Sequence, residues 1–363
     1  MKSGTDLGNA EGSLYANAQW RNTLGGAETL DVNVSYGTKT RSAYSAAFDT
    51  PVFANPDLRL QLGGVQSSTQ KVFASHEEVL RGGFAKFRWL SKAGTHEFGY
   101  SGFRRTLTGL AQNASPSVRA DAGDSFKSSL SHIWLNDKRD NPTLPSRGHY
   151  VRTMTELAGL GPLQGDVAFF KGEVEHQTAI PIPIPGVKGE SGVTFTAGVR
   201  AGALYPLTLA GQSSPSLSKI NDRFQLGGPT DVRGFRLSGL GPRDGSDAVG
   251  GDVYAAGGAS LLVPLPKVGA QSPLRLQAFV NGGRLLALRG GKEGSLSSDD
   301  VKSSMSKAIS ELGNGLPSTS AGIGLVYAHP VARFELNFSL PLVVRQGEDA
   351  RKGVQFGIGL NFL

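Results

Sequence analysis

Residues Gly227–Phe235 read GGPTDVRGF, and the expected fold is organised around them. This stretch lies in the connection 206–250 between two strand-like segments, and a connection of that length without its own secondary structure is usually functional or disordered. Its glycines permit sharp turns, Phe235 supplies an apolar anchor, and Arg233 presents a rigid fork of donors that suits a carboxylate. We therefore expect this loop to be ordered and docked on another part of the chain.

Alternating apolar and polar residues predict β-strands on both sides of the loop, because successive side chains of a strand point to opposite faces. In 332–342 one face is Ala, Phe or Leu and the other is Arg, Glu, Asn or Ser. The segments 30–36, 58–62 and 354–362 alternate in the same way. This template predicts sixteen strands, at 2–8, 11–21, 28–38, 41–51, 57–68, 76–91, 94–108, 122–136, 147–159, 165–180, 191–205, 251–263, 272–284, 318–328, 331–344 and 352–362.

The apolar faces favour a transmembrane barrel over a soluble sandwich. No apolar run reaches the roughly 18 residues that suggest a membrane helix, whereas a membrane strand needs only about 9–11 residues with every second one apolar. Leu, Phe, Val and Tyr continue along nearly every predicted strand, and two sandwiched sheets would need fewer and shorter strands. We expect an all-β fold, a 16-stranded antiparallel transmembrane β-barrel, formed by a single domain over 1–363.

Loop lengths support the same fold. The three longest predicted connections, 109–121, 206–250 and 285–317, all open on the same side, an asymmetry typical of membrane barrels. The third contains one predicted helix at 297–313, with acidic residues in its first turn, apolar residues at helical spacing and a glycine stop. We expect this loop helix to pack one face on the barrel rim; docking of a partner is the alternative.

Composition argues against several other classes. The net charge is +7, but Lys and Arg are dispersed without a basic stripe interleaved with aromatics, so no nucleic acid is expected as a partner. The chain has no cysteine, which excludes disulfides and thiol-ligated metals. The six histidines are scattered singly, and there is neither a nucleophile elbow nor a phosphate-cradling loop. We therefore predict no enzyme activity, no cofactor and no metal site.

The loop motif has a known counterpart. Val232, Arg233, Gly234 and Phe235, followed by Gly-Pro and by Gly-Gly-Asp-Val-Tyr at 250–254, resemble the large inward-folded loop of the barrel-assembly superfamily of outer-membrane proteins. The longer match, which runs on to Pro-Leu-Pro at 264–266, is most similar to the central barrel of the mitochondrial sorting and assembly machinery. The resemblance implies that 206–250 folds into the barrel lumen and docks there through these four residues.

The resemblance also suggests where Arg233 binds. In the family the loop arginine contacts acidic or polar residues on the inner wall of the strands that follow, and here Asp252 is the nearest candidate. Family members often carry a Phe-x-Asp-x-Gly element on the subsequent strand, where this chain reads Phe-Val-Asn-Gly-Gly at 279–283. Asn281 can accept a hydrogen bond at that position but brings no charge.

The two ends of the chain predict a weak join. The first predicted strand, 2–8, is short, polar and contains glycine, which weakens a strand. Closing the barrel requires it to pair with 354–362, whose pattern resembles the C-terminal sorting signal of outer-membrane barrels. An open join exposes unpaired backbone N–H and C=O groups, with which another strand can pair. The predicted gate consists of Gly4, Thr5, Asp6, Leu7, Gly8, Gln355, Phe356, Gly357, Ile358, Leu360 and Phe362.

The function implied by the resemblance is insertion and folding of β-barrel precursors through this lateral gate, by β-strand addition. The implied partners are the precursors, receptor subunits on the cytosolic face, a second β-barrel and membrane lipids. The implied location is the mitochondrial outer membrane, with the bacterial outer membrane as the alternative. Because family members carry a soluble domain ahead of the barrel and Met1 directly precedes the first predicted strand, we expect that domain to be absent here. The rival function is a passive diffusion porin or polypeptide-conducting channel, which would need neither the long loop nor the weak join.

Overall fold

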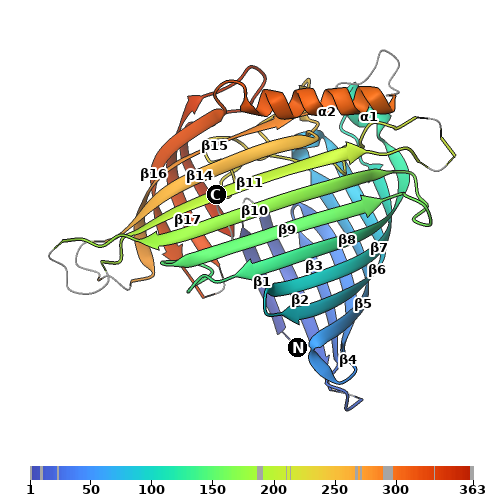
Figure 1. Ribbon diagram of the computed structural model, residues 1–363, viewed down its shortest axis with the longest axis horizontal. Helices are drawn as coiled ribbons and strands as arrows, with labels where there is room; N and C mark the ends of the chain where they lie inside the picture. The colour runs from blue at the N-terminus through green and yellow to red at the C-terminus, as the bar shows by residue number, and fades with distance from the viewer. Residues whose placement is uncertain are drawn as a thin grey trace.

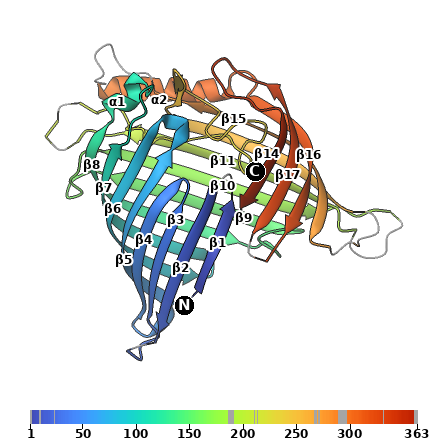
Figure 2. The same cartoon turned by 180° about the vertical axis from the view of Figure 1, so that it is seen from behind.

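A sixteen-stranded antiparallel sheet curls round to form the wall of the molecule (Figures 1 and 2). The computed structural model describes residues 2–8, 11–22, 24–185, 191–209, 211–212, 214–265, 269, 272–288, 297–330 and 332–359. The strands, in the order in which they pair, are β1 (Lys2–Gly8), β2 (Glu11–Arg21), β3 (Thr29–Gly37), β4 (Thr40–Val52), β5 (Asn55–Lys71), β6 (His76–Ser91), β7 (Gly94–Thr108), β8 (Gly123–Asp137), β9 (Gly148–Ala158), β10 (Phe169–Pro181), β11 (Thr194–Pro206), β14 (Val253–Pro264), β15 (Leu274–Leu286), β16 (Ser318–Ala328), β17 (Arg333–Val343) and β18 (Gly353–Gly359).

The predicted fold class is confirmed, with additions in the loops. The predicted loop helix is α2 (Ser298–Gly313), whose first turn is closed by a capping box between Ser297 and Asp300. Three short pieces were not predicted: the 3₁₀ turn η1 (Val72–Ala74), helix α1 (Pro116–Ala120) and the β12–β13 hairpin (Arg243–Asp244 and Asp247–Ala248). Each is too short to show a sequence period. Within the described residues, neither helix combines the length and the apolar character needed to cross a membrane.

The two faces of the wall are chemically opposite. On β17 the polar residues Glu335 and Asn337 are buried, whereas Leu336 and Phe338 are 47% and 49% exposed. A soluble protein would bury the second pair and hydrate the first. Large apolar side chains are exposed in the same way on most other strands. The apolar face is therefore the outer face, and it suits hydrocarbon rather than water.

The connection between β11 and β14, residues 207–252, folds into the interior and is named the lumen loop. Its apolar residues Phe224, Leu226, Val232, Phe235 and Leu240 are buried in one cluster with residues of the wall. Isolated backbone bridges join Phe224 to Gly251 and Leu226 to Leu240 within the loop. The lumen loop thus shares a compact apolar core with the inner wall, and this core fixes where its polar tip lies.

The sheet ends at β1 and β18. Within the described residues β1 pairs with β2 and β18 with β17, and no backbone ladder joins β1 to β18. The two strands nevertheless approach each other, with some Cα atoms within 8 Å. Figure 2 shows the dark blue β1 on one side of this join and the red end of the chain on the other. The join is the place in the described wall where the ladder is interrupted.

Candidate functional site

Arg233 at the tip of the lumen loop is bonded to Glu335 on β17. Its Nε and Nη2 atoms lie 3.0 Å and 2.9 Å from Glu335 Oε2, and both side chains are essentially unexposed. The guanidinium also lies over the ring of Phe279 on β15, 4.8 Å from its centroid. Charge-assisted contacts of this kind are strong where water is excluded. Arg233 therefore holds the loop tip against the wall just before the join.

Glu335 is shared between two cations. Arg333 Nη2 lies 2.5 Å from Glu335 Oε1, and Asn337 Nδ2 donates to Oε2 at 2.7 Å. Buried charges are tolerated only when paired and hydrogen-bonded, and both arginines are paired with this carboxylate. Glu335 is the central member of this cluster, because its loss would leave two cations facing each other.

The backbone of the loop tip is bonded to the last strand. Gly234 N–H donates to Gln355 Oε1 at 2.8 Å, and Gln355 Nε2 donates to the Phe235 carbonyl at 3.0 Å. The segment that leads into β18 is bonded as well, since Arg351 N–H donates to the Gly234 carbonyl at 2.8 Å. Ser320 Oγ on β16 donates to the carbonyl of Arg233. The lumen loop therefore holds β18 from inside the barrel.

Replacing Gly234 with alanine should weaken this docking. Its φ is +83°, and a Cβ there would lie 2.7 Å from the Cβ of Ser320. We expect a loss of about 1–3 kcal/mol, measured as the urea midpoint of the heat-modifiable barrel band on a gel. Gly245→Ala is the matched control, because Gly245 also has a positive φ (+60°) but no atom within 4 Å of its Cβ position. Equal effects would mean that the contact with β16 contributes nothing.

The structure corrects the expected partner of Arg233. Asp252 was predicted as the nearest candidate, but its carboxylate accepts bonds from Ser218 Oγ and from the Leu288 N–H (2.8 Å). The acid that contacts Arg233 is Glu335. Alternation marks Glu335 as inward-facing, but it cannot rank one inward acid above another. Asp252 instead ties the start of β14 to the lumen loop and to the end of β15.

Asn281 lies beside Arg233, as the motif suggested. With its amide oriented to satisfy its neighbours, its oxygen accepts from the Arg233 backbone N–H at 3.0 Å and from Nη1 at 3.2 Å. Its nitrogen then donates to Ser320 Oγ at 2.7 Å. A neutral amide suffices at this position because Glu335 supplies the negative charge.

A second contact that holds the lumen loop to the wall was not predicted from the sequence. Arg105 on β7 forms two bonds to the carboxylate of Asp222, at 2.6 Å and 3.1 Å, and both side chains are buried. Asp247 in the hairpin accepts from the N–H of Ser115 at 2.8 Å. Burial raises the pKa of a third loop acid, Asp231, against the opposing effect of Arg200. The loop is thus fastened to two widely separated parts of the wall.

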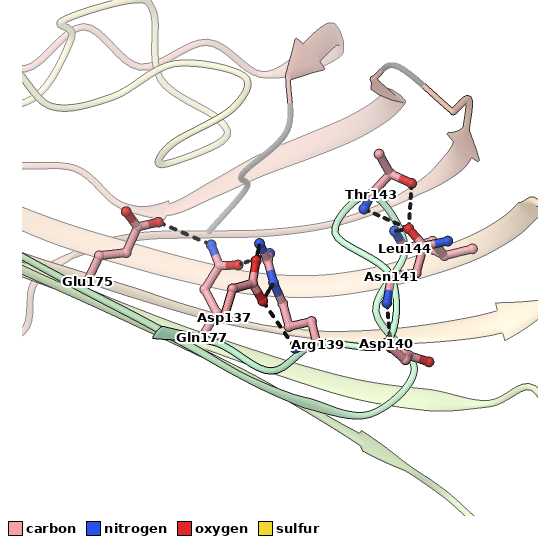
Figure 3. Close-up of polar contacts among 8 residues, drawn as sticks. All are labelled: Asp137, Arg139, Asp140, Asn141, Thr143, Leu144, Glu175 and Gln177. Carbon is pink, nitrogen blue, oxygen red and sulfur yellow. Dashed lines mark hydrogen bonds and ion pairs between the residues drawn. The ribbon is translucent and has the colours of Figure 1, made fainter. Parts of the chain in front are cut away.

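The opposite end of the barrel carries another ordered loop, residues 138–147, which was also not predicted (Figure 3). Arg139 bonds both carboxylate oxygens of Asp137 at 2.9 Å and 2.7 Å, donates to Gln177 at 3.1 Å and lies over the ring of Tyr150. The two prolines of the loop line a small pocket with residues of β10, β11 and β14 and with Arg333. Loop 138–147 therefore turns into the bore from the end away from the lumen loop.

The predicted gate residues are described only in part. Gln355 faces inward and is buried, Phe356 faces outward and is 50% exposed, and Gly357 and Ile358 follow them on β18. Leu360 and Phe362 lie outside the described residues. The backbone of Gly4, Thr5, Asp6, Leu7 and Gly8 forms β1, and the side chains of Thr5, Asp6 and Leu7 lie outside the description. The structure brings one predicted gate residue, Gln355, into contact with two predicted loop-docking residues, Gly234 and Phe235. No group of His, Asp or Glu within the described ranges could hold a metal ion.

An antiparallel wall with its apolar face outward and a long loop bonded into its bore defines a transmembrane β-barrel with an internal docked loop. The chain belongs to the Omp85 superfamily, since residues 22–362 match the Omp85 superfamily domain. A SAM50-like protein of Schizosaccharomyces pombe is 41% identical over 368 residues, which cover 100% of this chain and 72% of that protein. The sorting and assembly machinery component 50 homolog of Homo sapiens is 35% identical over 363 residues, 99% of this chain and 72% of that protein.

A solved structure shows the same fold at low sequence identity. BamA from Haemophilus ducreyi lacking POTRA domains 1–3 aligns with a TM-score of 0.75 and 16% identity, over 98% of this chain and 68% of that one. The superfamily match and the SAM50 relatives confirm the resemblance predicted from the Val-Arg-Gly-Phe loop. The SAM50 relatives place the chain in the mitochondrial outer membrane, and the bacterial alternative belongs to more distant members of the superfamily.

Proposed function

We propose that this chain inserts and folds β-barrel precursors in the mitochondrial outer membrane, through a lateral gate between β1 and β18. Its relatives are named as components of a sorting and assembly machinery, which supports a role in barrel assembly. The observation that carries the gate is the interrupted ladder: within the described residues, β1 and β18 approach each other without pairing. Membership of the family supports the role in barrel assembly, and the geometry of β1 and β18 supports the lateral gate.

Strand addition follows from the chemistry of an unpaired edge. Within the described residues, the side of β1 that faces away from β2 has no ladder partner, and backbone N–H and C=O groups cannot remain unmet in hydrocarbon. A precursor strand that pairs there satisfies them and receives a template for its own first ladder. While the precursor pairs with β1, the lumen loop keeps β18 in place through Gln355. The join can therefore open at β1 while the rest of the wall stays paired. No covalent bond is made or broken in this mechanism.

The rival function, a passive porin or polypeptide-conducting channel, fits the interior less well. A diffusion pore needs an open aqueous lumen. Here the lumen loop buries an apolar core in the bore, and loop 138–147 enters from the other end. The proposal therefore treats the interior as a scaffold for the join rather than as a path for solutes.

The proposed partners are the precursors themselves, receptor subunits on the loop-rich cytosolic side, and a second barrel. The loop-rich side carries α2, which lies across the rim near β11, β14 and β15 (Figure 1). On α2 the side chain of Ile309 is 55% exposed, while Val301, Met305 and Ala308 are buried against the barrel. The partially uncovered apolar side of this helix supports the placement of receptor subunits there.

Crosslinking to a precursor tests the gate. A cysteine at Thr5 on β1, in a chain that has no other cysteine, should form a disulfide with a cysteine in the last strand of an arriving precursor. Val32→Cys is the control, because β3 is paired on both sides by β2 and β4. A precursor that is captured equally at both positions, or at neither while it is still inserted, would rule out strand addition at β1.

A further inference from the structure

Two arginines lie side by side on the outer face of the barrel. Arg81 on β6 and Arg104 on β7 are direct partners in the antiparallel register. Arg105 points inward to its bond with Asp222, so the adjacent Arg104 must point outward. Directly opposed residues of paired strands share a face, which places Arg81 outside as well. Both side chains are exposed on the face that otherwise carries apolar residues.

Their level along the wall corresponds to a membrane interface. Trp89 and His96, whose rings stack 5.3 Å apart, face outward on the same two strands, eight positions below Arg81 and Arg104 respectively. At about 3.3 Å per residue and a tilt of about 35–45°, that spacing is about 20 Å along the membrane normal. The apolar band of such barrels is about 25 Å tall. The arginines therefore lie near the loop-rich edge of the apolar band, where their long side chains can reach the headgroups.

The charge of this pair is incompletely balanced by the protein. Arg104 is paired with Asp124 on β8, whereas among the described side chains no carboxylate pairs with Arg81. Like charges directly opposite each other in a ladder are destabilising, and an anion that bridges them removes the repulsion. Gln66 on β5 is the register partner of Arg81 on its other side and adds a polar group at the same level.

An apolar groove lies below the arginines on the same face. Its lining includes Ala85 and Phe87 of β6, Phe98 and Tyr100 of β7, and Leu130 of β8. The level between the groove and the arginines carries Gly83 and Gly102, which are register partners. The level itself is covered from its sides, since the Tyr100 hydroxyl and the ring edge of Phe126 on β8 lie 3.6 Å and 3.5 Å from the Cβ position of Gly102. These two aromatic side chains link the arginine level to the groove.

We infer that this face binds an anionic phospholipid, with its phosphate between Arg81 and Arg104 and an acyl chain in the groove. The charge of the pair selects an anionic headgroup, and the groove directly below selects an amphiphile over a soluble anion. This site is separate from the join and independent of the proposed insertion mechanism.

Lipid retention tests the inference. The purified chain is placed in nanodiscs of phosphatidylcholine with phosphatidylglycerol as the anionic probe, and retained lipids are counted by native mass spectrometry. We expect the unmodified chain to retain phosphatidylglycerol about tenfold over its share of the bilayer, and Arg81→Gln with Arg104→Gln to bring that ratio near one. Lys302→Gln with Lys307→Gln, on exposed positions of α2, removes the same charge and should leave the ratio unchanged.

Two further outcomes keep the test decisive. Ala85→Phe fills the groove without changing any charge and should lower retention several-fold, while heat-modifiable migration verifies that each variant is folded. Equal phosphatidylglycerol retention in all variants would overturn the inference. So would a disulfide between two copies of a Gly83→Cys chain in the native membrane, because it would show that this face is covered by protein instead of lipid.

Discussion

Glu335→Gln should undock the tip of the lumen loop and abolish most precursor assembly. The substitution removes the one carboxylate that Arg233 and Arg333 share, and it leaves two buried guanidinium groups facing each other. Breaking a buried ion pair by removing one partner costs about 3–5 kcal/mol. Arg233→Ala should cost less, because Glu335 keeps Arg333 and Asn337. We therefore expect Glu335→Gln to destabilise the barrel more than Arg233→Ala does.

The comparison requires both a stability and a function measurement. Stability is followed by the urea midpoint of the heat-modifiable band, the position of the loop by protease cleavage within 207–252, and function by assembly of a precursor barrel. Arg243→Ala is the control. Arg243 lies in the same loop, but its ion pair with Asp349 is long, at 3.7 Å, and partly exposed to solvent. If all three variants assembled precursors equally well, the docked arginine would have no role in the function.

Much of the fold could be predicted from residue alternation, because a barrel wall with hydrocarbon on one side imposes period two on every strand. The sixteen strands were found in this way. The inward folding of the loop was instead implied by the family resemblance of its Val-Arg-Gly-Phe motif, and the structure buries that loop in the bore. Alternation gives the face of a residue but not its height or its neighbour across the bore. The bond from Arg233 to Glu335 rather than Asp252 depends on the height at which the loop enters, and that height is set by three-dimensional packing.

Two other causes explain the parts of the structure that the sequence did not predict. Loop 138–147 is held by side chains that bond their own nearby backbone, such as Asn141 Oδ1 accepting from the N–H of Thr143 at 2.9 Å. Such bonds have no sequence period. The pair of Arg105 and Asp222 joins residues 117 positions apart, a separation over which single-sequence patterns carry no information. Sequence reasoning therefore found the candidate site but assigned its carboxylate incorrectly.

The central claim is that the join between β1 and β18 must open. A disulfide between cysteines at Thr5 and Gly357, tested over neighbouring registers, should close it reversibly, because the two strands already approach each other. The control is a cysteine pair at Phe338 and Val354, which are register partners on strands that are already paired. The second pair should form its disulfide without affecting function.

The most direct measurement is the rate at which a precursor barrel is inserted with each disulfide oxidised and then reduced. We expect a loss of insertion rate of about tenfold or more with the β1–β18 disulfide oxidised, recovery on reduction, and no change for the control pair. Undiminished insertion through a fully oxidised join would contradict the claim that the join must open.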